Sequence, residues 1–143
     1  MSGTLTKSFV GELGQGLHNL SSDTLMLALY KSDVALGKTT TQYTATQECE
    51  DGGDYSAGGV ALVKSWQTTG DVPYLSIADI TLEGLVGQDI YQALIYNSTY
   101  SNKSVAWFTL DRIYNFNSGT FTLRFPPNNG NEALIRITGV SDG

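Results

Sequence analysis

The chain is divided into short apolar runs of strand length, separated by clusters of Gly, Asn, Pro and Ser. The runs are rich in Val, Ile, Thr and aromatic residues, which is typical of β-strands. We expect strands at residues 23–30, 60–66, 74–79, 90–96, 104–110, 120–125 and 133–138. We expect turns at residues 58–59, 97–102, 115–119 and 126–131, where residues that accept turn geometry are concentrated.

Several of these runs alternate between apolar and polar residues. In residues 120–125, Phe121, Leu123 and Phe125 face one side, while Thr120, Thr122 and Arg124 face the other. Such alternation is typical of an antiparallel strand with one buried face. Seven or eight such strands in 143 residues predict an all-β fold, an antiparallel β-sandwich or jelly roll with a single core.

An apolar stripe at helical spacing precedes the first strand. Its members are Leu5, Phe9, Leu13, Leu17 and Leu20. This spacing predicts a short amphipathic helix within residues 4–20, weakened by Gly11, Gly14 and Gly16. We therefore divide the chain into an N-terminal arm or short helix, residues 1–21, and a β-sandwich domain, residues 22–143. Two interpretations stay open: the segment attaches to a partner, or it covers one end of the sandwich.

The long stretch from residue 31 to residue 57 contains no convincing core strand, although residues 41–46 could form an edge strand. Connections of this length are uncommon and are usually functional. We expect partner contacts here and in the N-terminal segment. The candidate contact residues are Leu5, Phe9, Leu13, Tyr43 and Tyr55.

The residues that could carry nucleophilic catalysis are few. His18 is the only histidine, and it lies in the weak N-terminal helix, where a surface or helix-end position is the simpler interpretation. Cys49 is the only cysteine, and the flanking carboxylates of Glu48 and Glu50 disfavour its thiolate. We therefore assign no catalytic residue and expect a structural or adhesive protein rather than an enzyme.

Carboxylates are more numerous, but their spacing selects no site. Asp79, Glu83, Asp89 and Asp111 are possible members of a carboxylate pair, yet no two of them are singled out. The acidic segment 48–54 could hold a cation, although it does not match the EF-hand pattern and a solvated turn explains it more simply. Phosphate-binding glycine motifs are also lacking. We expect no metal and no cofactor.

The charge distribution narrows the class of partner. The formal net charge is −6, and the eight Lys and Arg residues are scattered along the chain. A surface of this kind repels phosphate backbones and anionic lipids, so we expect neither nucleic-acid nor membrane partners. No apolar run is long enough to span a bilayer, and the first residues lack a signal-type core. We therefore expect synthesis and folding in a cytoplasm.

Three motifs carry a resemblance that extends over about residues 25–137. They are Tyr-Ser-Ala-Gly-Gly at 55–59, Ala-Leu-Ile-Tyr-Asn at 93–97 and Gly-Thr-Phe-Thr-Leu-Arg-Phe-Pro at 119–126. In this succession the chain resembles a family of small structural proteins of tailed-bacteriophage virions. It departs from their pattern in residues 48–50 and in the apolar stripe of its N-terminal segment.

The resemblance implies a virion structural protein of the capsid cement or decoration type. Such a protein would bind between subunits of the major capsid protein, stabilise the shell, and form a homo-oligomer, a dimer or a trimer. It would reside on the capsid surface of the virion after synthesis in the host cytoplasm. The alternative is a tail- or fibre-associated module that binds a receptor or carbohydrate. The third interpretation is a small hydrolase, which the residue chemistry disfavours.

Overall fold

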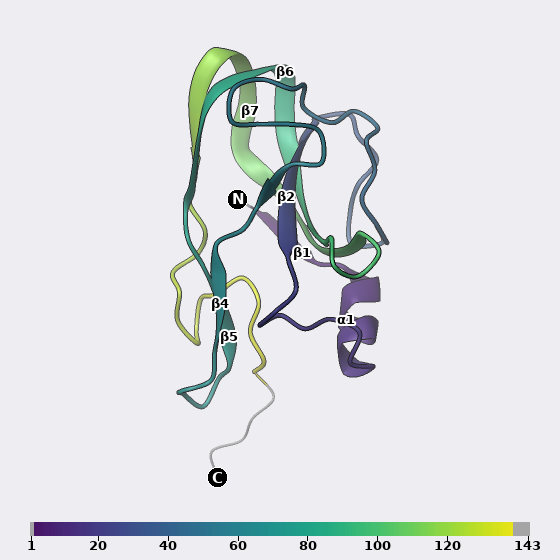
Figure 1. Ribbon diagram of the computed structural model, residues 1–143, viewed down its shortest axis with the longest axis vertical. Coiled ribbons are helices and arrows are strands. Elements are labelled where there is room, and N and C mark those ends of the chain that lie inside the picture. The colour runs from purple at the N-terminus through teal and green to yellow at the C-terminus, as the bar shows by residue number, and fades with distance from the viewer. Residues whose placement is uncertain (1, 139–143) are drawn as a thin grey trace.

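A long hairpin forms the centre of the fold and joins strands that the sequence suggested were separate. The computed structural model describes residues 2–138 and contains two antiparallel sheets and one short helix (Figure 1). The expected all-β sandwich with a short N-terminal helix is therefore confirmed. The elements are β1 (Ser2–Leu5), α1 (Lys7–Gly14), β2 (Leu25–Lys31), β3 (Val60–Ala61), β4 (Lys64–Gln67), β5 (Tyr74–Ile77), β6 (Ile80–Asn97) and β7 (Lys103–Leu123).

The larger sheet has five strands in the order β1-β7-β6-β2-β3, and the smaller pairs β4 with β5. The predicted turn at residues 115–119 is wrong, because these residues lie inside β7. They interrupt the regular pairing of β7 with β6 but do not reverse the direction of the chain. The ladder shifts register there, Ser118 has a φ of 57°, and the Asn115 side chain accepts a hydrogen bond from the Asp89 amide.

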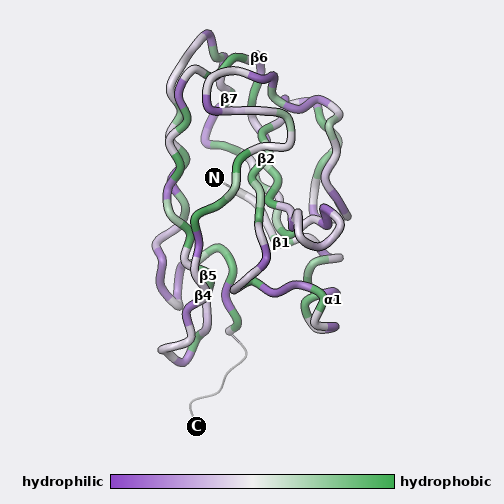
Figure 2. Tube along the Cα trace, in the orientation of Figure 1, coloured by the Kyte–Doolittle hydropathy of each residue, from purple (hydrophilic) through white to green (hydrophobic). Residues whose placement is uncertain are grey.

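Strand β2 is buried on both faces, which fixes the layered arrangement. Leu25, Leu27 and Leu29 belong to the main core together with residues of β4–β5, whereas Ala28 and Tyr30 belong to a second, smaller cluster. Since successive side chains point to opposite faces of a sheet, both faces of the larger sheet are covered. In Figure 2 the hydrophobic stretches follow the strands in the middle of the molecule.

The N-terminal segment differs from its prediction. Helix α1 covers only residues 7–14, and residues 2–5 form an edge strand that pairs with β7. The helix ends early because Gly16 adopts a φ of 75°, and Gly16 and Leu17 turn their amides back to carbonyls of the last helical turn. Gly3 allows β1 to approach β7, because a Cβ there would lie 2.2 Å from the Trp107 carbonyl oxygen. Residues 2–14 thus supply an edge strand and a docked helix to the sandwich.

Two other predicted strands are also corrected. The run 60–66 is divided into β3 and the start of β4, which belong to different sheets. The run 133–138 forms no strand and makes a single bridge, between Arg136 and Tyr74. Its Ile135 is nevertheless fully buried, and its carbonyl accepts a hydrogen bond from the Leu75 amide. This segment therefore covers the outer edge of β5. Within residues 2–138 no helix has the length and apolar character needed to cross a membrane.

Candidate functional site

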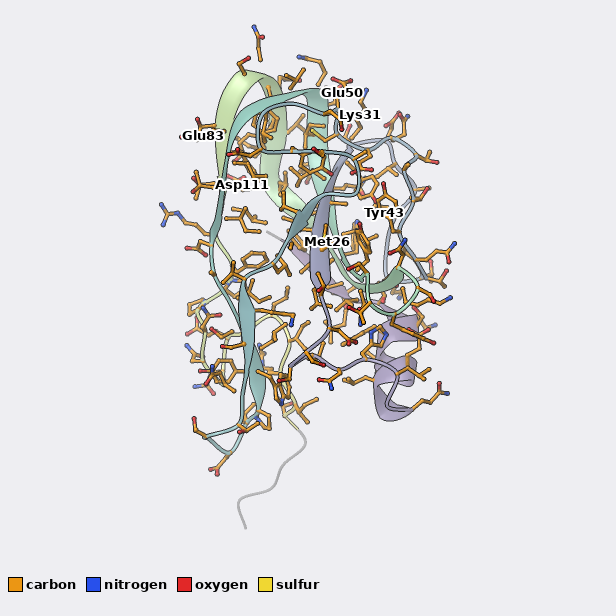
Figure 3. All side chains as sticks on the ribbon, viewed as in Figure 1. Met26, Lys31, Tyr43, Glu50, Glu83 and Asp111 are labelled. Atoms are coloured by element: carbon orange, nitrogen blue, oxygen red, sulfur yellow. The ribbon has the colours of Figure 1, made fainter. Side chains whose placement is uncertain are left out.

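The connection between β2 and β3, residues 32–59, begins on the face of the larger sheet that points away from β4–β5. It then passes along β2, where the Cys49 amide donates to the Leu29 carbonyl, and Cys49 and Tyr55 belong to the main core on the other face. We call this connection the β2–β3 loop; it runs along the right side of Figure 1. Its Val34 is buried against Tyr30, Leu94 and Tyr96 of the sheet, and Tyr43 packs against the same cluster. Figure 3 shows Tyr43 of the loop beside Met26 of β2. The loop is therefore an ordered layer with its own small core, although it contains no strand.

The carboxylate of Glu48 fastens this loop to itself and to the sheet. Its Oε1 accepts a hydrogen bond of 2.5 Å from the Tyr43 hydroxyl. Its Oε2 accepts bonds of 2.6 Å from the Tyr55 hydroxyl and 2.8 Å from the Gly58 amide. The Tyr55 oxygen in turn accepts the Leu29 amide of β2 at 2.9 Å. One carboxylate thus joins three points of the loop, one of them anchored to a core strand; we call this arrangement the Glu48 clamp.

The tyrosines around the clamp are held as neutral phenols. Burial raises the pKa of Tyr55 first, and the hydrogen bond to Glu48 raises it further. The pKa of Tyr43 is raised by the same two causes in the same order. Their hydroxyl groups therefore remain hydrogen-bond donors to the carboxylate throughout the neutral range.

The Tyr-Ser-Ala-Gly-Gly motif forms one side of the clamp. Gly59 has a φ of 90°, and a Cβ on it would lie 2.0 Å from the Leu27 carbonyl oxygen. The Gly58 carbonyl accepts a hydrogen bond from the Tyr96 hydroxyl, which belongs to the Ala-Leu-Ile-Tyr-Asn motif. Two of the three motifs that carry the sequence resemblance therefore meet here, and their shared role is to hold the β2–β3 loop in place.

Asn97, the last residue of the second motif, organises the turn between β6 and β7. Its Oδ1 accepts the amides of Thr99 and Tyr100, while its Nδ2 donates to Asp23 at 2.8 Å and to His18. A buried amide with all these partners is typical of a structural turn residue.

His18 is buried rather than exposed, and it lies beyond the end of α1, which corrects the expectation that it is a surface residue within the helix. Its Nδ1 accepts the Asn97 amide group at 3.0 Å, and its Nε2 lies 2.9 Å from Glu12 Oε1. Both ring nitrogens are therefore engaged. The ring also makes edge contacts with Phe9 and Tyr100. The observed role of His18 is to join the helix to the β6–β7 turn.

The structure places the candidate contact residues in two separate regions. Phe9 of α1 is fully buried in the main core, and Leu5 and Leu13 are half-buried against the same core. Tyr55 is buried in the Glu48 clamp, and Tyr43 is half-buried on the loop. Of the two interpretations of the N-terminal segment, the arrangement in which it packs on the sandwich describes this chain. Phe9 and Tyr55 present almost no surface to a partner.

The acidic segment is used within the loop. Asp51 accepts the Ala57 amide at 2.7 Å, and Asp54 accepts the Glu83 amide at 2.9 Å. Asp51 thus satisfies a backbone N–H group of the loop itself, whereas Asp54 satisfies one in β6, where the ladder with β7 is irregular. Between residues 2 and 138, no three His, Cys, Asp or Glu side chains lie together as a set of metal ligands.

Cys49 lies beneath the loop, where its thiol contacts the Val86 carbonyl oxygen at 3.3 Å. Burial, followed by the charges of Glu50 and Glu48, raises the pKa of the thiol to about 11. The prediction that the thiolate is disfavoured is confirmed, with burial rather than the carboxylates as the main cause.

Every exposed residue of the loop between positions 39 and 47 is uncharged. These residues, which we call the Thr/Gln surface, are Thr39, Thr41, Gln42, Ala45, Thr46 and Gln47. Their side chains are short or amide-bearing and can form hydrogen bonds without desolvating a charge. The length of this connection predicted a functional loop, but nothing in the sequence marked Glu48 as its anchor. One sequence signal did indicate a covered second face of the sheet. The residues that alternate with the core leucines of β2 are also apolar, namely Met26, Ala28 and Tyr30.

Comparisons of this chain with family models, with curated proteins and with solved structures gave no match.

Proposed function

We propose that this chain is a capsid cement or decoration protein of a tailed bacteriophage, which binds between major capsid subunits and stabilises the shell. The observation that carries the proposal is the ordered β2–β3 loop, which the Glu48 clamp holds in one conformation while its outer side stays free. A loop fixed in advance loses little conformational entropy on binding. The three threonines and Ala45 of the Thr/Gln surface have short side chains, which add little further rotamer entropy.

The motifs that resemble those of virion structural proteins support the proposal from a second direction. In this chain, Tyr55, Gly58, Gly59 and Tyr96 build the clamp and its seat on the sheet. Two of the three motifs that carry the resemblance thus supply residues that hold the loop in place. We place the attachment surface on the Thr/Gln surface, and we propose a homo-oligomer, a dimer or a trimer, on the virion.

The test is to remove the gene from the phage that encodes this chain and to add the purified protein back to the resulting particles. Particles should assemble without it, release DNA at lower temperature, and regain their heat resistance as the protein binds to saturation. The variant with Thr41→Arg and Thr46→Arg should lose binding. The matched control, with Thr69→Arg and Thr120→Arg at other exposed positions, should retain it. Unchanged heat resistance on removal and restoration would exclude a cement role.

A second candidate function is favoured by a separate cleft of about 280 Å³ beside an irregularity in β7. Between the Gln92–Thr109 and Ile90–Tyr114 pairs, β7 has more residues than β6 and forms a bulge. Asp111 lies in this bulge and lines the cleft. Tyr114 and Arg124 also line the cleft, and the Tyr114 hydroxyl donates to Asp111 at 2.7 Å. A carboxylate and a guanidinium together supply hydrogen-bond acceptors and donors, which suits a polyhydroxy ligand such as a carbohydrate. Binding of the isolated protein to host glycans, lost in Arg124→Ala, would favour a tail- or fibre-associated module.

A further inference from the structure

Two tyrosines from distant parts of the chain are paired under the β2–β3 loop. Tyr43 belongs to the loop and Tyr96 to β6, and their ring centroids are 4.7 Å apart with an angle of 32° between the ring planes. Among the aromatic contacts of residues 2–138, this is the only one between two tyrosine rings. Tyr43 is half-buried, so that a reagent in solution has access to the pair, whereas Tyr96 is buried.

The hydroxyl ends of both rings converge on Gly58. Tyr96 donates to the Gly58 carbonyl, and Tyr43 donates to Glu48, whose other oxygen accepts the Gly58 amide at 2.8 Å. The two phenol oxygens therefore lie at the same end of the stack. Phenoxyl radicals couple through the ring carbons next to the C–O bond. In both rings these carbons lie at the same end of the stack as the phenol oxygens.

Glu48 gives Tyr43, the accessible member of the pair, a proton acceptor. When a tyrosine loses an electron, its phenol proton must leave, and the Tyr43 hydroxyl already donates to the Glu48 carboxylate over 2.5 Å. Charge-assisted hydrogen bonds of this length are strong and well aligned. The proton thus moves a short distance along an existing hydrogen bond.

We propose that Tyr43 and Tyr96 are a modification site at which a one-electron oxidant forms an intrachain dityrosine. Each phenol gives up one electron and one proton, the two radicals join through a carbon–carbon bond, and the ring hydrogens shift to restore both phenols. The pair loses two hydrogen atoms in total, and hydrogen peroxide activated by a haem peroxidase takes them up as water. The product ties the β2–β3 loop covalently to β6.

The test treats the folded, full-length chain at low concentration with a haem peroxidase and hydrogen peroxide. We expect blue dityrosine fluorescence, a monomer on a denaturing gel, and a mass lower by two hydrogen atoms. A peptide map should join the segments that contain Tyr43 and Tyr96. Tyr43→Phe and Tyr96→Phe should each lose the signal, and Tyr91→Phe, which alters a tyrosine outside the pair, should keep it.

Three outcomes would overturn the proposal. They are a cross-link mapped to other tyrosines, a cross-link found only between chains, and oxygen addition without any dityrosine, for example at Met26, which packs in the same cluster. If a phenylalanine variant fails to fold, the peptide map of the unaltered chain decides the question alone.

Discussion

Replacing Glu48 with alanine should release the β2–β3 loop while leaving the two sheets folded. The change removes the acceptor of three hydrogen bonds, those from Tyr43, Tyr55 and the Gly58 amide. Hydrogen bonds to a charged group contribute about 1.5–3 kcal/mol each. Tyr43 and Gly58 are half-buried and can bond to water instead, so the loss is mainly that of the bond from the buried Tyr55, about 1.5–3 kcal/mol. A loss of that size is a large part of the stability of an ordinary domain.

The assays are urea unfolding and native-state hydrogen exchange. We expect a lower unfolding midpoint and faster exchange at the amides of Cys49 and Gly58, because Cys49 donates to the Leu29 carbonyl only while the loop is seated. Glu50→Ala is the matched control, since Glu50 is exposed and its one ion pair, to Lys31, spans 3.7 Å at the surface. If the two alanine variants differ by less than about 0.5 kcal/mol, the clamp does not hold the loop as described.

Three further outcomes follow from burial and backbone geometry. Phe9→Ala should lower the free energy of unfolding by about 3–5 kcal/mol, whereas Val10→Ala, at a position 56% exposed, should change it little, as thermal unfolding can measure. Gly59→Ala should destabilise the chain, because its Cβ would lie 2.0 Å from the Leu27 carbonyl oxygen. Gly11→Ala in α1, where a Cβ meets nothing within 4 Å, should stabilise the chain by about 0.5–1 kcal/mol. Equal effects of the two substitutions in urea unfolding would contradict the assigned geometry. The Cys49 pKa of about 11 lies above the value of about 8.5 for an unfolded thiol. Its contribution to stability is therefore complete below about pH 8.5 and is lost as the pH rises toward 11; thiol labelling of the folded chain at pH 8–9 that matches the rate of unfolded chain would refute this.

The strands that could be predicted are those in which apolar content and turn residues agree. Residues 23–30 and 74–79 closely match β2 and β5, since each is a single apolar run with turn residues on both sides. The prediction is wrong at residues 115–119, because Asn, Ser and Gly are suited both to a turn and to a strand irregularity. Only pairing with residues 85–90 of β6 decides between these two uses.

The candidate site could be predicted from the sequence even less completely than the strands. The length of the stretch 31–57 was sufficient to select the loop, but nothing local to Glu48 distinguishes it from Glu50. The difference arises from Tyr55 and Gly58, which lie later in the chain and meet one of these carboxylates only in the folded protein. The burial of Phe9 within its own chain could not be predicted from the sequence either. An apolar stripe on a helix has the same spacing whether the helix packs on its own sheet or on a partner.

The chain order of the strands has a consequence for folding during synthesis. Strands β6 and β7 are neighbours in sequence and joined by the turn that Asn97 organises, so their ladder can form as soon as both have left the ribosome. Strand β1 is made first, yet it pairs with residues 106–109 of β7, and the adjoining Thr6 hydroxyl meets Ser104, 98 positions away. Strand β1 must therefore wait, unpaired, until residues 106–109 of β7 have been synthesised. We expect nucleation in the β6–β7 hairpin and late addition of β1 and α1, so that substitutions at Gly3 or Phe9 should mainly accelerate unfolding and leave the folding rate little changed.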